Sequence, residues 1–133
     1  MYQGSCLCGT IKFQIKGAIS DIVKCHCSLC RKAQGSAFAT NGNVNTNEFS
    51  FISGEDNLSH YKASENQTKS FCKTCGSPIM SKNSLYPDKL RIRLGTIETN
   101  INERPTAHIF VASKANWDEI NDSIPQFDKY VQR

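Results

Sequence analysis

The spacing of seven cysteines constrains this chain of 133 residues more than any other feature. They form two pairs, Cys6/Cys8 and Cys72/Cys75, and a trio, Cys25/Cys27/Cys30. Two pairs supply four thiolates, which complete the tetrahedral shell of a structural zinc. A trio supplies three thiolates and leaves one position open to water or to a substrate atom. We therefore predict two zinc ions per chain, with no cysteine left over.

The cysteine count also indicates the redox environment. An odd number argues against a framework built only of disulfides. The segment 1–5 lacks the basic stretch and apolar core of a signal peptide, and no apolar run approaches the roughly 20 residues of a membrane helix. We expect a cytoplasmic protein without a membrane segment, in which thiols stay reduced and bind metal. A redox pairing between the two cysteine pairs is the alternative for that site.

The formal charge of +4 counts every cysteine as neutral. Seven thiolates with two Zn²⁺ would leave the chain near +1. Lysine and arginine are dispersed, apart from small groups at Arg31-Lys32 and at Arg91 and Arg93. Dispersed positive charge is usually a solvated surface, so the composition argues against a nucleic-acid partner.

The hydrophobic pattern has mostly period two, which is typical of strands. Ile11, Phe13 and Ile15 share one face of the segment 10–16, and the segment 90–94 alternates with its arginines outward. Further strands are expected at 48–52, 58–62, 68–72 and 107–112, with turns at 41–43 and 53–54. The pattern predicts an all-β fold of antiparallel sheets, in a single zinc-binding domain spanning residues 1–133.

Helix is expected in two short places. The segment 28–35 predicts a helix with Ser28 as its N-cap and Gly35 at its C-terminal end. A second short helix is expected at 115–122, just before Pro125. The first one begins inside the cysteine trio.

Each cysteine pair is followed directly by a glycine, Gly9 or Gly76. A tight turn around a metal requires positive φ, which glycine tolerates. The run 72–78 is a strong zinc-knuckle signal, whereas a pair separated by one residue is weaker alone. Together the pairs predict a structural zinc that joins segments more than sixty residues apart and stabilises the fold.

The trio raises the question of a fourth protein ligand. His26 lies between two ligands, so we expect its side chain to point away from their shared ion. His60 and His108 are the other candidates for closing the shell. Without them, Cys25, Cys27 and Cys30 form a catalytic zinc site with an open position.

Several metal chemistries lack their partner residues here. None of the histidines or cysteines is followed two residues later by the glutamate of a zinc deaminase, and His-Glu-x-x-His is absent. An iron–sulfur cluster usually takes four cysteines. Three thiolates blunt the Lewis acidity of zinc toward water and suit a soft ligand. The trio therefore predicts a site where a small thiol is held as thiolate, ready to attack an electrophile.

Three motifs carry a resemblance to a known family. They are Gly4-Ser5-Cys6-Leu7-Cys8-Gly9, the run from Cys25 to Ala37, and Phe71-Cys72-Lys73-Thr74-Cys75-Gly76-Ser77, with Leu94 to Ile97, Pro105 to Ile109 and Trp117 downstream. In the order and spacing of all seven cysteines the chain resembles the glutathione-dependent formaldehyde-activating enzyme family, which includes centromere protein V.

That resemblance implies a β-tent fold of antiparallel sheets with two zincs. It places a structural zinc on the positions of Cys6, Cys8, Cys72 and Cys75, and a zinc near the glutathione site on those of Cys25, Cys27 and Cys30. The implied reaction is the addition of glutathione to formaldehyde, giving S-(hydroxymethyl)glutathione, with carbon–sulfur lyase activity in the reverse direction.

Two questions stay open at this point. Glutathione carries two carboxylates, and its basic partners could be any of Arg31, Lys32, Arg91, Arg93 and Arg104. The alternative to an enzyme is a non-catalytic zinc-binding module for glutathione, protein or nucleic-acid partners.

Overall fold

The computed structural model describes residues 1–132, which form a mostly β structure with one α-helix. The strands are β1 (Tyr2–Ser5), β2 (Lys12–Ile15), β3 (Ser20–Cys25), β4 (Ala39–Asn45), β5 (Phe49–Ser53), β6 (Leu58–Lys62), β7 (Gln67–Cys72), β8 (Pro78–Asn83), β9 (Lys89–Arg93) and β10 (Ala107–Ile109). The helix is α1 (Ser28–Gln34), and 3₁₀ turns are η1 (Thr46–Glu48), η2 (Glu55–Asn57), η3 (Leu94–Thr96) and η4 (Val111–Ser113). The β-rich class is thus confirmed. Across residues 1–132 no helix has the length and hydropathy needed to cross a membrane.

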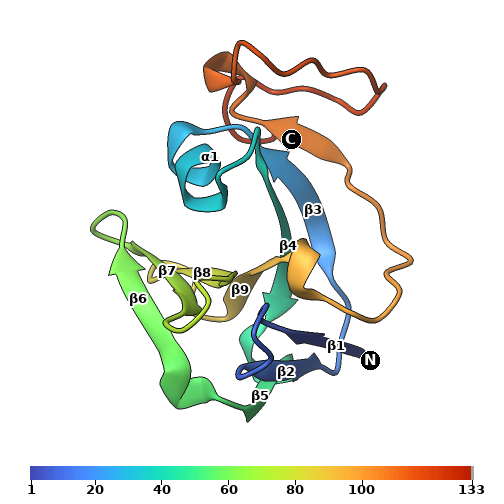
Figure 1. The fold of residues 1–133 in the computed structure, drawn as a ribbon. Coiled ribbons are helices and arrows are strands. Elements are labelled where there is room, and N and C mark those ends of the chain that lie inside the picture. Colours follow the sequence, from blue (N-terminus) through green and yellow to red (C-terminus); the bar gives the residue numbers. More distant parts are fainter. Residues whose placement is uncertain (133) are drawn as a thin grey trace.

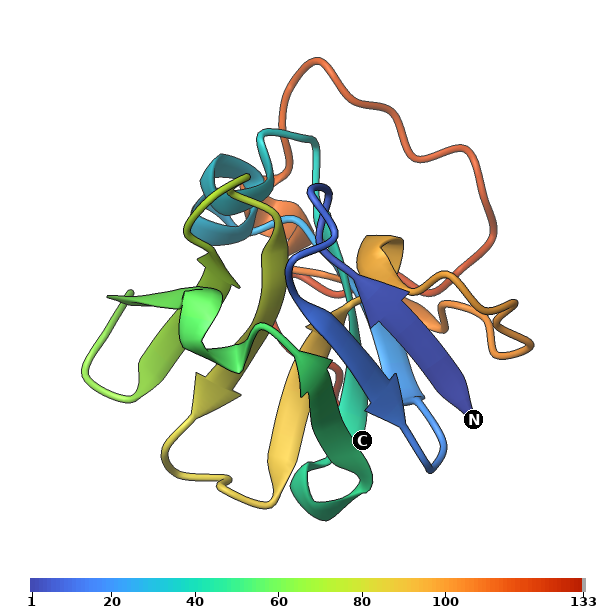
Figure 2. The same ribbon diagram turned by 60° about the horizontal axis from the view of Figure 1, so that its bottom comes forward.

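Two sheets build the fold. The small sheet has the order β1-β2-β5, and the large one has the order β10-β3-β4-β9-β8-β7-β6. The small sheet lies against one face of the large sheet, and α1 lies over the other (Figures 1 and 2). The sheets are antiparallel as expected, except at one edge, where β10 pairs parallel to β3. The long segment 97–106 carries the chain back along the outside before β10 begins, which makes a parallel pairing possible (Figure 1).

The main core fills the space between the sheets. Ile11, Phe13 and Ile15 are fully buried, as their alternation predicted. They form one cluster with Leu90 and Ile92 from β9 and with further side chains of the large sheet. Because side chains of a strand alternate between faces, the residues between these apolar ones point to the opposite face of the large sheet.

That opposite face is polar and only partly open to solvent, with Ser81 buried and Arg91 half-buried. Arg91 pairs with Asn43 on one side and with Ser81 on the other, so these side chains line up across the sheet. Arg93 is only 4% exposed, which corrects the prediction that both arginines point outward into water. It shares a cavity with Cys27 and Cys30, which the chain places over this face.

The predicted turn at 41–43 is also wrong, because these residues lie in the middle of β4. Asn41 is 2% exposed and pairs with Arg93. At Gly42 an added Cβ would lie 2.4 Å from Cγ2 of Ile19. Glycine is therefore present for close packing, and the Asn-Gly-Asn composition does not make a turn here.

Helix α1 confirms the first helix prediction with one correction. Its N-cap is Cys27 rather than Ser28, because the Cys27 sulfur accepts the N–H of Cys30 at 3.3 Å. Gly35 ends the helix in the left-handed region at φ 64°, as expected. The second helix, expected at 115–122, is absent from the described chain.

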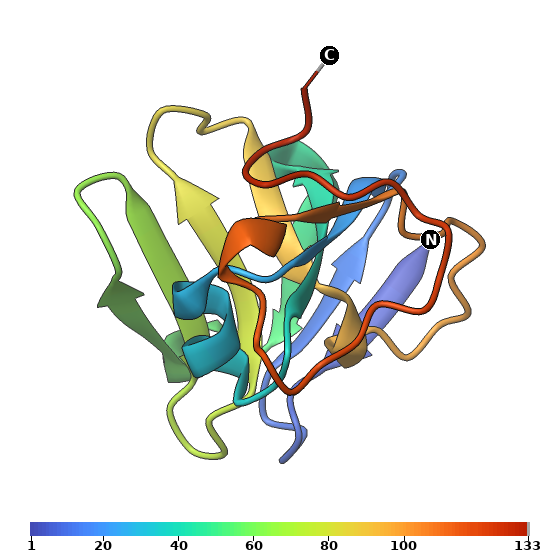
Figure 3. The ribbon, with the colours of Figure 1, turned by 90° about the horizontal axis from the view of Figure 1, so that it is seen from above.

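The C-terminal segment instead wraps around β10. His108 donates its N–H to the carbonyl of Pro125 at 2.8 Å and accepts the N–H of Phe127 at 2.9 Å. Figure 3 shows this segment lying along β10 above the large sheet. Strand β10 stops at Ile109, shorter than the predicted 107–112, because Phe110 turns into the left-handed region at φ 56° and opens η4.

Candidate metal centres and the groove beside the trio

The two cysteine pairs come together at one site. Cys6 and Cys8 lie in the connection from β1 to β2, and Cys72 and Cys75 lie at the β7–β8 knuckle. The Sγ atom of Cys8 lies 3.6 Å from the Sγ atom of Cys6 and 3.8 Å from that of Cys72. All four sulfurs lie within 4.8 Å of one another. A tetrahedral zinc with Zn–S bonds of about 2.3 Å separates its sulfurs by about 3.8 Å. These four residues can hold a metal ion and fit zinc.

The backbone at this site folds as the two glycines predicted. Gly9 and Gly76 have φ of 81° and 79°, and their N–H groups donate to the carbonyls of Cys6 and Cys72. The sulfurs also receive hydrogen bonds, from the Ile11 N–H to Cys6 and from the Asn57 amide to Cys72, both at 3.3 Å. Such donors stabilise negative charge on thiolates, so the site is prepared for metal-bound sulfur.

The pKa values at this site differ with their surroundings. Hydrogen bonds from the Ser77 hydroxyl and N–H lower the pKa of Cys75 to about 5. Burial raises the pKa of Cys6. Half of the site thus faces the core and half faces water.

The trio forms the second candidate centre. Cys25 ends β3, Cys27 caps α1, and Cys30 lies in the first turn of the helix. Their three sulfurs lie within 4.8 Å of one another, and within residues 1–132 no histidine, aspartate or glutamate joins the group. His60 instead bonds Ser70 at 2.7 Å, and His108 bonds His26 at 2.9 Å. His26 is not part of the sulfur group, in line with the prediction that it does not bind the shared ion.

The trio shares negative charge unevenly when no metal is bound. Hydrogen bonds from the Cys25 and Cys30 thiols lower the pKa of Cys27 to about 2. The hydrogen bond with Cys27 in turn raises the pKa of Cys25. Cys27 is therefore the thiolate of the trio, and it is also the most exposed of the three.

A cavity of about 140 Å³ opens beside the trio, and we call it the trio cavity. Three cations line it, Lys69 from β7 and Arg91 and Arg93 from β9. Arg93 donates from Nη1 to the Ser81 hydroxyl at 3.3 Å, while its buried Nε has no protein partner. The cavity therefore brings positive charge close to three sulfurs, which suits an anionic ligand.

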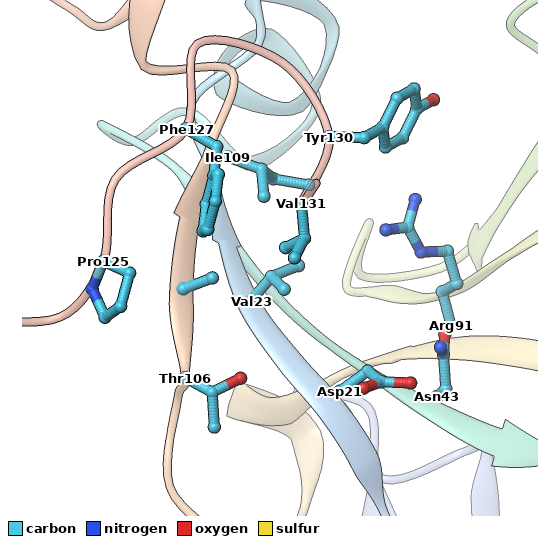
Figure 4. Close-up of a pocket in the computed structure, with 11 residues that line it drawn as sticks. Asp21, Val23, Asn43, Arg91, Thr106, Ile109, Pro125, Phe127, Tyr130 and Val131 are labelled. Carbon is cyan, nitrogen blue, oxygen red and sulfur yellow. The ribbon is translucent and has the colours of Figure 1, made fainter. Parts of the chain in front are cut away.

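Two larger cavities share Arg91 and Tyr130 with the trio cavity. One of about 580 Å³, the basic groove, is lined by Lys82, Lys89 and Arg91 among others. The other, of about 300 Å³, lies between β10 and the C-terminal segment (Figure 4). Arg91 and Tyr130 line all three cavities, so they stand where the cavities meet. Figure 4 shows their side chains on the same side of the opening.

The five basic residues that the sequence offered as partners of glutathione differ in their position relative to these cavities. Arg91 and Arg93 line the trio cavity, but Arg31, Lys32 and Arg104 line none of these three cavities. Arg104 donates instead to the carbonyls of 101–103. Sequence reasoning missed Lys69, Ser81 and Tyr130. Lys69 and Ser81 could have been found only from the pairing of β7, β8 and β9, which places them in one row with Arg91.

Comparison with known proteins agrees with these observations. A family model described as glutathione-dependent formaldehyde-activating enzyme matches residues 1–113. A crystal structure of a Rhodobacter sphaeroides protein has a TM-score of 0.63 and 22% sequence identity, covering 77% of this chain and 97% of that chain. The structural likeness concerns the fold. The match over 1–113 contains both cysteine clusters and the three cations of the trio cavity.

Proposed function

The chain belongs to the glutathione-dependent formaldehyde-activating enzyme family, and on that premise we propose that it adds glutathione to formaldehyde or a related small aldehyde. The product would be S-(hydroxymethyl)glutathione, and the reverse reaction is that of a carbon–sulfur lyase. We further propose two zinc ions, one held by Cys6, Cys8, Cys72 and Cys75 and one by Cys25, Cys27 and Cys30. Because both sites need reduced thiols, we place this domain of residues 1–133 in the cytoplasm.

One observation carries the proposal: three clustered sulfurs face a small cavity lined by Lys69, Arg91 and Arg93. Zinc bound there would hold an incoming thiol as a thiolate near neutral pH. The three cations would attract the carboxylates of an acidic thiol and offset the charge of the sulfurs. An uncharged ligand would use none of these contacts.

The cavity volumes indicate how the thiol would lie. About 140 Å³ is small beside the 300–1,000 Å³ of typical ligand pockets, so the trio cavity accepts little more than the thiol end and an aldehyde. The rest of the glutathione molecule would occupy the basic groove, where Arg91 can pair with one of its carboxylates in bidentate fashion.

The reaction then needs one bond to form. The thiolate sulfur attacks the carbonyl carbon of the aldehyde, the carbonyl π electrons become an alkoxide, and the alkoxide takes up a proton equivalent to the one that the thiol lost. The residues of the chain contribute by holding the thiol and aldehyde in contact range, which lowers the entropic cost of their meeting.

The test uses the zinc-loaded protein with glutathione and S-methylglutathione. We expect glutathione to bind much more tightly, because a thioether cannot become a thiolate. Formaldehyde added to the glutathione complex should give adduct faster than the uncatalysed background, and Cys27→Ser should abolish the excess rate. Equal binding of the two ligands, or no rate above background, would favour the non-catalytic module instead.

A further inference from the structure

Two buried histidines and the exposed Asp122 link the loop between Cys25 and Cys27 to the C-terminal segment. His26 and His108 are 0% and 2% exposed, and Nε2 of His26 lies 2.9 Å from Nδ1 of His108. Nε2 of His108 lies 3.0 and 3.1 Å from the two carboxylate oxygens of Asp122. His26 lies between β3 and α1, His108 lies in β10, and Asp122 lies in the loop that follows η4.

We propose that Asp122 and His108 are positioning residues for the trio, acting through His26. The proposal rests on the metal at the trio that the proposed function assumes. It does not require that the protein act on glutathione or on an aldehyde. None of the three residues belongs to the group of sulfurs, so their action is on the geometry of the loop between Cys25 and Cys27.

The hydrogen bonds select one arrangement of protons. The Asp122 carboxylate only accepts, so Nε2 of His108 carries the hydrogen. In neutral His108 the lone pair of Nδ1 then accepts the hydrogen on Nε2 of His26. This leaves Nδ1 of His26, which is buried without a protein partner, as an unpaired acceptor. If His26 instead carried its hydrogen on Nδ1, that buried N–H donor would have no partner.

The backbone of His26 is fixed by the same region. Its N–H donates to the carbonyl of Ile109 at 2.9 Å, and its carbonyl accepts from the Ser113 hydroxyl at 3.3 Å. The ring packs against Phe38, with centroids 5.1 Å apart. With ring and backbone both held, the two neighbouring cysteines start from a fixed position, and binding a metal requires less ordering of the loop.

The experiment compares Asp122→Ala, Asp122→Asn and two controls in the zinc-loaded protein. The controls are Glu119→Ala, an exposed acid in the same loop, and Lys24→Gln, which removes the 3.9 Å ion pair of Asp122. A chelator competes for zinc, and release from the trio and from the pair site is followed separately. Thermal unfolding and the ¹⁵N resonances of the histidine rings are measured beside it.

Asp122→Ala should speed zinc release from the trio by about tenfold, the lower end of the effect of losing an outer partner of a metal site. Release from the pair site should not change. Asp122→Asn should behave like the unchanged protein, because its amide oxygen still accepts from His108. In the unchanged protein the ¹⁵N spectrum should show hydrogen on Nε2 of both His26 and His108.

Three results would overturn the proposal. They are trio release in Asp122→Ala equal to that of the two controls, a loss in Asp122→Asn as large as in Asp122→Ala, and hydrogen on Nδ1 of His26. Failure of the proposed function looks different: adduct would form no faster than the uncatalysed background, while Asp122→Ala would still speed zinc release from the trio. An unchanged protein that held no zinc at the trio would overturn both.

Discussion

The two cysteine clusters use the same side chain in opposite surroundings. Cys6 and Cys72 belong to the main core between the sheets, together with Phe13 and Ile79. The trio lies on the other face of the large sheet, beside a cavity with three cations. Four sulfurs, two of them in the core, can complete their own shell, whereas three sulfurs beside a basic cavity leave room for a ligand. The number of sulfurs and their surroundings, rather than the type of ligand atom, are the basis on which we propose one structural and one reactive site.

The comparison predicts its largest effect on stability. Cys72 is fully buried, and its site joins the β1–β2 connection to the β7–β8 knuckle. Structural zinc contributes about 10–16 kcal/mol in zinc-finger peptides, as much as the net stability of about 5–15 kcal/mol of a typical domain. Cys72→Ser should therefore unfold or aggregate the protein, while Cys27→Ser should stay folded. Circular dichroism and thermal melts would check this, and equal losses would make the trio structural too.

The trio should also lose its metal ion more readily than the pair site. The pair site presents four sulfurs to a metal ion and the trio presents only three. A mild chelator should remove one zinc per chain quickly and leave the other, with Cys25, Cys27 and Cys30 becoming reactive to alkylation first. Simultaneous loss of both ions, or first loss from the pairs, would break the contrast. Metal analysis with mass mapping of the alkylated cysteines separates these outcomes.

A smaller effect should mark the cations of the trio cavity. Arg91 lines all three adjoining cavities, whereas Arg104 lines none of them. A hydrogen bond to a charged group contributes about 1.5–3 kcal/mol, so Arg91→Gln should weaken glutathione binding by roughly tenfold or more. Arg104→Gln is the matched control and should bind normally. Titration calorimetry measures both, and equal affinities would remove Arg91 from the binding site.

The smallest predicted effect concerns the metal-free trio. Its thiol neighbours lower the pKa of Cys27 to about 2 and raise that of Cys25. A lowered pKa means that Cys27 stays a thiolate as the pH falls, so at pH 6 it should be alkylated before Cys25. The contrary result would be that all three cysteines react together, with a midpoint near the ordinary thiol pKa of about 8.5. That result would show that the hydrogen bonds among the three thiols are absent in solution.

Sequence reasoning succeeded where the signal was local. The cysteine spacing, the positive φ of Gly9 and Gly76, and the alternation around Phe13 each depend on neighbours in the chain. These features predicted the two sulfur clusters, the knuckles and the buried face of β2. Local propensity was also enough to place α1, although the N-cap proved to be Cys27.

It failed where distant segments decide the structure. Asn41 and Gly42 have turn composition, but pairing of β4 with β9 makes them strand residues. Arg93 alternates like an outward side chain, yet the trio and α1 cover its face. The helix expected at 115–122 yields to contacts of Asp122 and Pro125 with His108, which no local pattern announces.

The central claim is that one metal site is closed and the other is open to a thiol. Replacing zinc by ¹¹³Cd and recording its NMR spectrum tests this directly, because the shift responds to the number of bound sulfurs. We expect two resonances, of which only the trio resonance moves when glutathione is added and neither moves with S-methylglutathione. A single resonance, or two that both ignore glutathione, would contradict the account.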